Sequence, residues 1–185
     1  MQSPDGSGIE VPEALLPLSW LIGTWVGVGT GQYPTIEDFR FAQEIVVATD
    51  GRPFLSYYSR SWLLDDSGER VRPLATETGF WRPRPDNGIE LLLSHPSGYA
   101  EVWTGSQEIT GIVDARITGA RATLATQTVA ASPSAKDYTR GQRMYGLVNG
   151  RLAWLFEMEA MGQPLQNHLA IELRPASDLG AGEAA

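Results

Sequence analysis

Cysteine is absent from all 185 residues of the chain, and this absence removes several classes of protein. A chain without thiols has no disulfide framework, no thiolate nucleophile, no cysteine-ligated zinc finger and no iron–sulfur cluster. Histidine is almost as scarce, since only His95 and His168 occur. Two histidines are too few for a histidine-rich zinc cluster, and a Ser-His-Asp triad would have to use one of them.

Positive charge and long apolar segments are also in short supply. Fourteen basic residues stand against 22 acidic ones, which gives a formal net charge of −8 at pH 7. Nucleic acids and anionic membrane surfaces bind basic patches, so we expect neither as a partner. No apolar run is long enough to cross a bilayer, and the first residues lack the basic region and apolar core of a signal peptide. The sequence therefore predicts a cytoplasmic protein.

The chain has the length of one ordinary domain and contains no internal repeat. Residues 1–10 and 176–185 are polar and rich in small residues, and we expect both to be disordered tails. The folded domain is then residues 11–175. Between Pro12 and Ile22 the sequence allows one or two helical turns, which Pro17 keeps short.

The rest of the chain alternates apolar runs with turn signals. The pairs Asp50-Gly51 and Asn149-Gly150 each predict a tight turn between two strands. In the strand predicted at 152–160, every second residue is apolar, which indicates the wall of a core or a cavity; these residues are Leu152, Trp154, Phe156, Met158 and Ala160. Nine or ten strands without intervening helices favour a sandwich or a barrel. Because closure removes exposed strand edges, we predict an antiparallel β-barrel around a ligand cavity.

Glycines occupy alternate positions in the segment 23–36, whose sequence is GTWVGVGTGQYPTI. In a strand, Gly23, Trp25, Gly27 and Gly29 share one face, so one indole is followed by bare backbone. Glycine weakens a strand unless something lies close against it, so this face predicts contact with a flat ligand or another backbone. A phosphate-binding loop is disfavoured because neither the Lys-Ser/Thr pair nor a helix follows the glycines.

His168 is the first candidate for chemistry. By strand alternation it shares a face with Gln166, Ala170 and Glu172, opposite Leu169. From periodicity alone it is either a partly exposed strand residue or a metal or cofactor ligand inside the barrel, where small Ala170 leaves room beside it.

Two further polar residues stand out. His95 precedes Pro96 in a turn, and we expect it at the surface. Glu77 lies among apolar neighbours, and a buried carboxylate usually pairs with arginine. We therefore expect a structural ion pair between Glu77 and either Arg82 or Arg143.

Several motifs in this chain occur together in one family. The pattern Gly-x-Trp-x-Gly-x-Gly-x-Gly-x-Tyr-Pro runs from Gly23 to Pro34, and Thr35 follows it directly. Further matches are GRPFL at 51–55, ETGFWR at 77–82, HPSG at 95–98, GQPL at 162–165 and HLA at 168–170. With these motifs in order over nearly the whole folded part, the sequence closely resembles nitrobindin, a haem-binding β-barrel whose bacterial members are assigned as peroxynitrite isomerases.

The resemblance implies a ten-stranded barrel of the lipocalin and fatty-acid-binding type, with one ferric haem b near its mouth. Trp25 matches the indole that closes one barrel end. His168 matches the proximal iron ligand of the family, and Thr35 matches a threonine that contacts the haem. Two histidines that family members often carry are replaced here by Thr49 and Ala75. We therefore expect a distal side with fewer proton donors.

The resemblance also implies an activity, the isomerisation of peroxynitrite to nitrate at the ferric iron, and binding of nitric oxide at the same iron. Two alternatives remain open: a haem-based nitric oxide sensor or carrier without turnover, and a haem-free carrier of lipids or small molecules. Replacing His168 separates the haem-free carrier from both haem-dependent functions. No sequence feature gives the oligomeric state, and a homodimer is one expectation.

Overall fold

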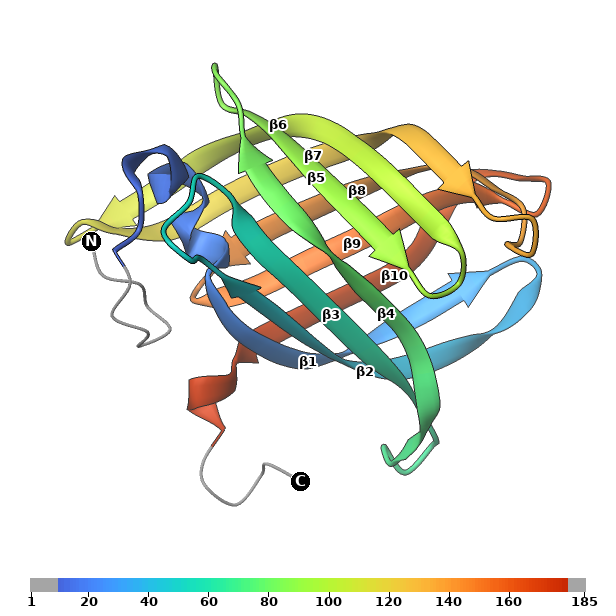
Figure 1. The fold of residues 1–185 in the computed structure, drawn as a ribbon. Helices are drawn as coiled ribbons and strands as arrows, with labels where there is room; N and C mark the ends of the chain where they lie inside the picture. The colour runs from blue at the N-terminus through green and yellow to red at the C-terminus, as the bar shows by residue number, and fades with distance from the viewer. Residues whose placement is uncertain (1–9, 180–185) are drawn as a thin grey trace.

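The structure is a computed structural model that describes residues 10–179. Of the disordered tails expected at residues 1–10 and 176–185, residues 1–9 and 180–185 lie outside the described residues, whereas residues 176–178 form a short 3-10 helix. Ten antiparallel strands form a closed barrel in which the last strand pairs with the first (Figure 1). The strands are β1 (Gly23–Tyr33), β2 (Ile36–Ala48), β3 (Leu55–Leu64), β4 (Arg70–Pro83), β5 (Gly88–His95), β6 (Tyr99–Val113), β7 (Arg116–Ala131), β8 (Tyr138–Val148), β9 (Arg151–Ala160) and β10 (Gln163–Pro175). The predicted barrel is confirmed.

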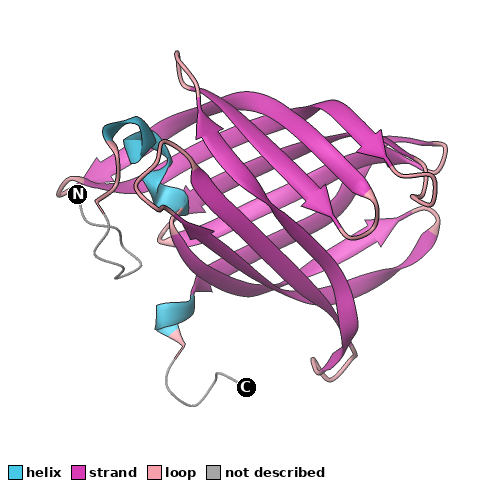
Figure 2. Cartoon of the chain, in the orientation of Figure 1, coloured by secondary structure: helices cyan, strands magenta, loops and turns pink. Residues whose placement is uncertain are grey.

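A 3-10 helix, η1 (Glu13–Leu21), lies at one end of the barrel and contacts β4, β6 and β7 (Figure 2). Its residues Leu15 and Leu18 are completely buried. The indole of Trp25 is also buried, and its Nε1 donates a hydrogen bond of 2.9 Å to the carbonyl of Leu21. Trp25 therefore ties η1 to the first strand and helps to close this end, as the Gly-x-Trp pattern predicts.

A second short 3-10 helix, η2 (Ala176–Asp178), follows β10. No helix within residues 10–179 is both long enough and apolar enough to span a membrane.

The glycine face of β1 lies against neighbouring strands. Gly29 pairs with Ile171 on β10 and with Phe41 on β2. A Cβ atom on Gly29 would lie 2.7 Å from the Cβ of Ile171 and 2.9 Å from the Cζ of Phe41. Such contacts are far below van der Waals separation, so this position requires a bare backbone. Of the two predicted reasons for the glycines, close packing against another strand is the one that applies here.

The predicted inner face of β9 is also confirmed. Leu152, Trp154 and Phe156 are buried and belong to the hydrophobic core that fills the closed half of the barrel. Tyr145 on β8 stacks on Trp154 with 5.7 Å between ring centroids and contacts Trp81 edge-on at 5.1 Å. This dense aromatic layer fills the barrel on the side of η1. The large internal cavity lies towards the other end.

Candidate functional site: a histidine in an open-ended cavity

The barrel end opposite η1 contains a cavity of about 1240 Å³. The turns between β1 and β2, β3 and β4, β5 and β6, and β7 and β8 surround its mouth. Side chains of β1 to β4, β9 and β10 line its walls, and His168 is one of them. The cavity is large enough for a drug-sized or larger ligand.

His168 enters this cavity because β10 is irregular at that point. Asn167 pairs with Glu157 on β9, and Leu169 pairs with the next residue, Phe156. His168 is therefore the extra residue of a β-bulge, a feature that redirects a side chain and shifts the alternation of the strand.

The bulge makes one sequence expectation wrong. Strand alternation predicts that His168 shares a face with Gln166, Ala170 and Glu172, but Ala170 and Glu172 lie on the outer side of the barrel. His168 instead lines the interior together with Leu169. Ala170 therefore makes no room beside the imidazole, and the interior position favours the second interpretation, a ligand-binding histidine.

A backbone carbonyl holds the His168 ring. Its Nδ1 lies 3.0 Å from the carbonyl oxygen of Gln32, at a point where the register of β1 against β2 also shifts. Burial lowers the pKa of the His168 imidazole, and the hydrogen bond to Gln32 only partly opposes this effect. A neutral imidazole that donates from Nδ1 presents the lone pair of Nε2, the form in which histidine binds metals.

Three aromatic rings surround the imidazole. The ring of Tyr33 lies 5.5 Å away between centroids, that of Phe156 lies 6.0 Å away and that of Phe39 lies 6.2 Å away. All three ring pairs are T-shaped, so the rings restrict the orientation of the imidazole. The Tyr33 hydroxyl is itself fixed, because it accepts a 2.9 Å hydrogen bond from the amide of Ala160.

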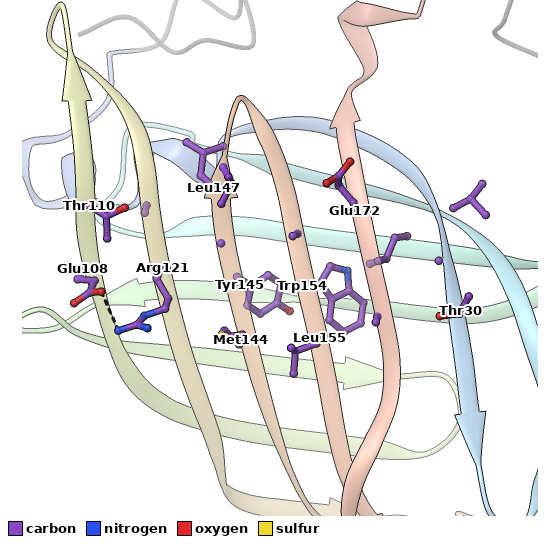
Figure 3. Close-up of a pocket in the computed structure, with 18 of the residues that line it drawn as sticks. Thr30, Glu108, Thr110, Arg121, Met144, Tyr145, Leu147, Trp154, Leu155 and Glu172 are labelled. Carbon is purple, nitrogen blue, oxygen red and sulfur yellow. Dashed lines mark ion pairs between the residues drawn. The ribbon is translucent and has the colours of Figure 1, made fainter.

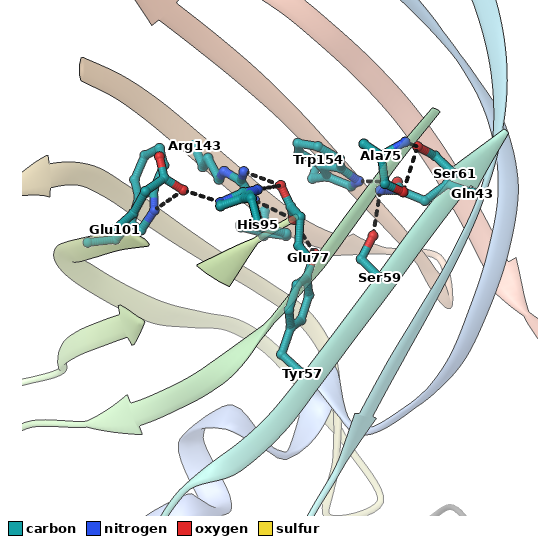
Figure 4. Close-up of polar contacts among 12 residues, drawn as sticks. Gln43, Tyr57, Ser59, Ser61, Ala75, Glu77, His95, Glu101, Arg143 and Trp154 are labelled. Carbon is teal, nitrogen blue, oxygen red and sulfur yellow. Dashed lines mark hydrogen bonds and ion pairs between the residues drawn. The ribbon is translucent and has the colours of Figure 1, made fainter. Parts of the chain in front are cut away.

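A polar wall lies on β2, β3 and β4 (Figure 4). Trp154 donates to the amide oxygen of Gln43 at 2.9 Å, and the amide nitrogen of Gln43 donates to the hydroxyl of Ser59 at 2.9 Å. The hydroxyl of Ser61 accepts a hydrogen bond from the amide of Ala75 at 3.2 Å. These groups satisfy one another, so the wall is polar yet already ordered.

Thr49 and Ala75, which stand where the resemblance leads us to expect histidine, lie in different parts of the structure. Ala75 lines the cavity. Thr49 is buried elsewhere, where its hydroxyl accepts a hydrogen bond from the amide of Gly51 at 3.2 Å and stabilises the turn after β2. Only the alanine therefore changes the lining of the cavity.

The predicted ion pair of Glu77 is formed with Arg143, one of the two expected partners. The guanidinium donates two hydrogen bonds, of 2.6 Å and 3.0 Å, to the two carboxylate oxygens. Burial alone would raise the pKa of the Glu77 carboxyl, but the charge and hydrogen bonds of Arg143 outweigh it and lower this pKa to about 2. Glu77 lines the cavity as a permanently ionised, fully engaged carboxylate.

The surface position expected for His95 is wrong. Its side chain is only 13% exposed, and its Nε2 lies 2.6 Å from a carboxylate oxygen of Glu101, which is also buried. Its Nδ1 faces Glu77 at 3.8 Å. His95 continues the inward-pointing series of β5 after Leu91 and Leu93, so it extends the polar cluster of Glu77 and Arg143 (Figure 4).

Thr35 lies in the turn between β1 and β2 and is exposed. This turn borders the cavity, and Gln32, three residues earlier, contacts His168. The Thr35 side chain itself is not among those that line the cavity. The remaining motif residues, Gly23 and Trp25, belong to the closed end.

A second hollow, of about 950 Å³, lies mainly on the outer side of β1 and β7 to β10 (Figure 3). It is mostly apolar, with Met144 and Val28 exposed, and the ion pair between Arg121 and Glu108 (2.9 Å) lies at its rim. No histidine lines this hollow. It therefore offers no imidazole, and the interior cavity, which His168 lines, is the candidate site.

A closed barrel with one imidazole directed into an open-ended cavity defines a ligand-binding β-barrel protein. Comparison with known proteins gives the family. The family model described as "THAP4-like, heme-binding beta-barrel domain" matches residues 14–174. The chain belongs to this family, and the resemblance to nitrobindin is confirmed.

Individual relatives agree with this assignment. A protein from a Nocardioides species named peroxynitrite isomerase is 48% identical over 83% of this chain and 87% of its own length. A protein from Kineococcus radiotolerans named ferric nitrobindin-like protein is 37% identical, over 91% of this chain and 96% of its own. The crystal structure of Rv2717c from M. tuberculosis has a TM-score of 0.81 and 36% identity, and the match covers 90% of this chain and 99% of that chain.

Proposed function

We propose that this protein is a haem-dependent peroxynitrite isomerase that holds one ferric haem b in the open-ended cavity. The observation that carries the proposal is His168, a neutral imidazole that is bound through Nδ1 and directed into a cavity of about 1240 Å³. Within residues 10–179, no group of three or more His, Asp and Glu side chains is arranged to hold a metal ion. A lone imidazole suits iron that a porphyrin already binds.

The residues of the chain divide the work in this proposal. His168 would hold the iron through Nε2, and the carbonyl oxygen of Gln32 accepts a hydrogen bond from Nδ1–H and so fixes the tautomer. Thr35 would contact the haem from the turn between β1 and β2, which borders the cavity. When bound, ferric haem supplies an open coordination position that acts as a Lewis acid on the peroxynitrite anion.

The reaction itself needs little from other side chains. Conversion of peroxynitrite to nitrate is an isomerisation, so no net proton enters or leaves. Two polar groups of the inner wall are already engaged: Glu77 is paired with Arg143, and Gln43 and Ser59 bond to each other. The cavity walls confine the reacting fragments until nitrate forms. The same open position accounts for nitric oxide binding.

We also propose that the protein is a cytoplasmic homodimer that uses the outer hollow of Figure 3. Val28 and Val148, both at this hollow, are 50% and 60% exposed. Its rim carries both charge signs, in Arg121 and Glu108, which is compatible with the same patch meeting itself across a twofold axis. In sedimentation experiments, Val148→Asp is expected to convert the dimer to a monomer, and an unchanged dimer would reject this surface.

The haem proposal is tested by titrating the purified protein with ferric haem, beside His168→Ala and the matched control Asn167→Ala. Asn167 is the exposed neighbour of His168 in the same bulge. We expect a defined Soret band at one haem per chain in the wild type and the control, and a lost or shifted band in His168→Ala. Equally poor uptake in all three proteins would reject the haem site and favour the haem-free carrier. With the haem site established, stopped-flow decay of peroxynitrite separates the isomerase from a sensor that turns nothing over.

A further inference from the structure

Phe39 and Gly31 face each other across β1 and β2 at the rim of the cavity. The two residues are a register pair, and both line the cavity beside His168. The ring of Phe39 lies directly over the Cα of Gly31, in the space that any larger residue at position 31 would fill. On the proposal that His168 binds haem iron, we propose that Gly31 and Phe39 are positioning residues that fix the plane of the His168 imidazole.

Gly31 differs from the other glycines of β1 in what it contacts. A Cβ atom on Gly27 would meet only the backbone of β10 among its three nearest atoms, and one on Gly29 would meet β10 atoms first and then the Phe41 ring, so these glycines serve mainly the closure of the barrel. At Gly31 the three nearest atoms all belong to the Phe39 ring. Gly31 also has no positive φ in this structure, so alanine carries no backbone strain there. The group that a side chain at position 31 would meet first is therefore the Phe39 ring.

The Phe39 ring in turn restricts His168. The hydrogen bond from Nδ1 to Gln32 anchors one edge of the imidazole but leaves rotation about the direction of that bond. The ring plane of Phe39, on β2, makes an angle of 62° with the imidazole plane. The ring plane of Tyr33, at the end of β1, makes an angle of 78° with it. Phe156 supplies a third edge at 67°. Together the edges leave the imidazole one plane, which determines the direction in which Nε2 points.

Among the three rings, Phe39 is the one that packs against the backbone of a glycine, Gly31. Tyr33 is fixed by hydrogen bonds from its hydroxyl, and Phe156 is part of the buried core. Phe39 is partly buried, and its second aromatic neighbour is Phe41, 6.1 Å away between centroids. Its position therefore depends on Gly31, and a change at either residue is transmitted to His168. Substitution of Phe39 is therefore expected to alter the iron–imidazole bond, whereas substitution of an aromatic residue far from His168 is not.

The test uses Phe39→Leu, Phe39→Tyr and the matched control Phe80→Leu. Phe80 is an exposed aromatic on the outer side of β4 that contacts Phe54 at 5.4 Å. Two properties are measured: the rate of haem transfer to an excess of apomyoglobin, and the iron–histidine stretching band of the ferrous protein by resonance Raman spectroscopy. Changes in residues that orient a metal ligand typically alter metal affinity by about 10- to 100-fold.

We expect Phe39→Leu to lose haem at least about tenfold faster, with a shifted or broadened iron–histidine band. Phe39→Tyr keeps the aromatic edge and is expected to behave like the wild type, as is Phe80→Leu. A wild-type rate and band in Phe39→Leu would overturn the inference. Equal changes in Phe39→Leu and Phe80→Leu would overturn it too, because they would indicate general destabilisation.

Gly31→Ala and the double variant Gly31→Ala/Phe39→Ala provide a second test. Gly31→Ala is expected to lower the melting temperature of the apoprotein and to speed haem loss, because the added methyl group displaces the ring. Removing the ring in the double variant relieves the overlap, so the melting temperature recovers while haem loss stays fast. Recovery of both properties would mean that Gly31 has only a structural role.

His168→Ala separates failure of this inference from failure of the haem proposal. If His168→Ala takes up haem like the wild type, the haem proposal itself fails and the positioning role falls with it. If His168→Ala loses the band while Phe39→Leu keeps the wild-type rate and band, only the positioning role is rejected.

Discussion

Arg143 and Glu77 form a two-point ion pair inside the barrel, with 2.6 Å between Nη2 and Oε1 and 3.0 Å between Nη1 and Oε2. The side chain of Arg143 is 2% exposed and that of Glu77 is 12% exposed. The guanidinium of Arg143 also lies over the rings of Trp103 and Phe156, with its Cζ 4.9 Å from each ring centroid. The barrel thus encloses a cation among aromatic rings, and one carboxylate compensates most of its charge.

Replacing this carboxylate is expected to destabilise the fold strongly. Glu77→Gln leaves the guanidinium buried without its anion, which costs about 3–5 kcal/mol in comparable buried pairs. The matched control is Glu159→Gln, which breaks the largely exposed pair with Arg140 and should cost about 1 kcal/mol or less. Urea unfolding of the apoproteins measures both values. Equal losses in the two variants would contradict the importance of the buried pair.

The same pair predicts a stability loss in acid. The pKa of Glu77 falls from an ordinary value of 4.5 to about 2 on folding, so the folded state favours the ionised carboxylate. This contribution, about 3 kcal/mol by linkage, is fully present above pH 4.5 and disappears as the pH falls through about 2. The difference in unfolding free energy between wild type and Glu77→Gln should therefore shrink over this range. A difference that stays constant with pH would show that the charge is not the cause.

The pKa of Glu101 is also lowered: burial would raise it, but the hydrogen bond to His95 and the charge of Arg143 together with smaller contributions outweigh burial. Glu101 is present in both proteins of that comparison. To first order its contribution cancels in the difference, which isolates Glu77.

Trp25 offers a test of the closed end. Trp25→Ala removes a buried indole and should cost about 3–5 kcal/mol of unfolding free energy. Trp25→Phe keeps most of the packing but loses the hydrogen bond to Leu21, which is worth about 1 kcal/mol. Because Trp25 lies at the end opposite the cavity, the folded fraction of either variant should bind haem like the wild type. Impaired binding by fully folded Trp25→Phe would mean that the two ends of the barrel are coupled.

Introducing histidine at Ala75 or at Thr49 is expected to have different effects on the haem spectrum and on stability. Ala75→His places an imidazole in the cavity lining, so we expect a ferric spectrum shifted towards six-coordinate iron and slower nitric oxide binding. Thr49→His removes the hydroxyl that holds the amide of Gly51 and should lower stability by about 1 kcal/mol without changing the spectrum. Absorption spectra and stopped-flow binding compare the two. A spectral change in Thr49→His alone would reverse the assignment of these positions.

The fold was predictable from the sequence where the two-residue alternation of a strand and the residue types of a turn agree. The apolar face of β9 and the turn at Asn149-Gly150 follow from local rules, and Asn149 does adopt the positive φ of 52° that such a turn requires. Glu77 was predictable as a buried ion pair because a carboxylate among apolar residues needs a cation. The choice of Arg143 over Arg82 was not, because that partner lies 66 residues away and depends on barrel closure.

The misses share a physical origin in departures from regular strands. The face of His168 could not be read from alternation, because a bulge adds one residue to β10 at that point. His95 looked like a turn residue beside Pro96, whereas the series Ile89, Leu91 and Leu93 on β5 continues inward to it. Here the alternation of burial was the available signal, and the adjacent proline obscured it.

The contact between His168 and Gln32 spans 136 residues of sequence. It joins the last strand to the first, so it forms only after the ribosome has delivered almost the entire folded domain. A nascent or truncated chain that ends before β10 has neither the imidazole nor the final pairing that closes the barrel. On the proposal that His168 binds the haem iron, the haem site is therefore complete only after the last strand has been synthesised and has paired with the first.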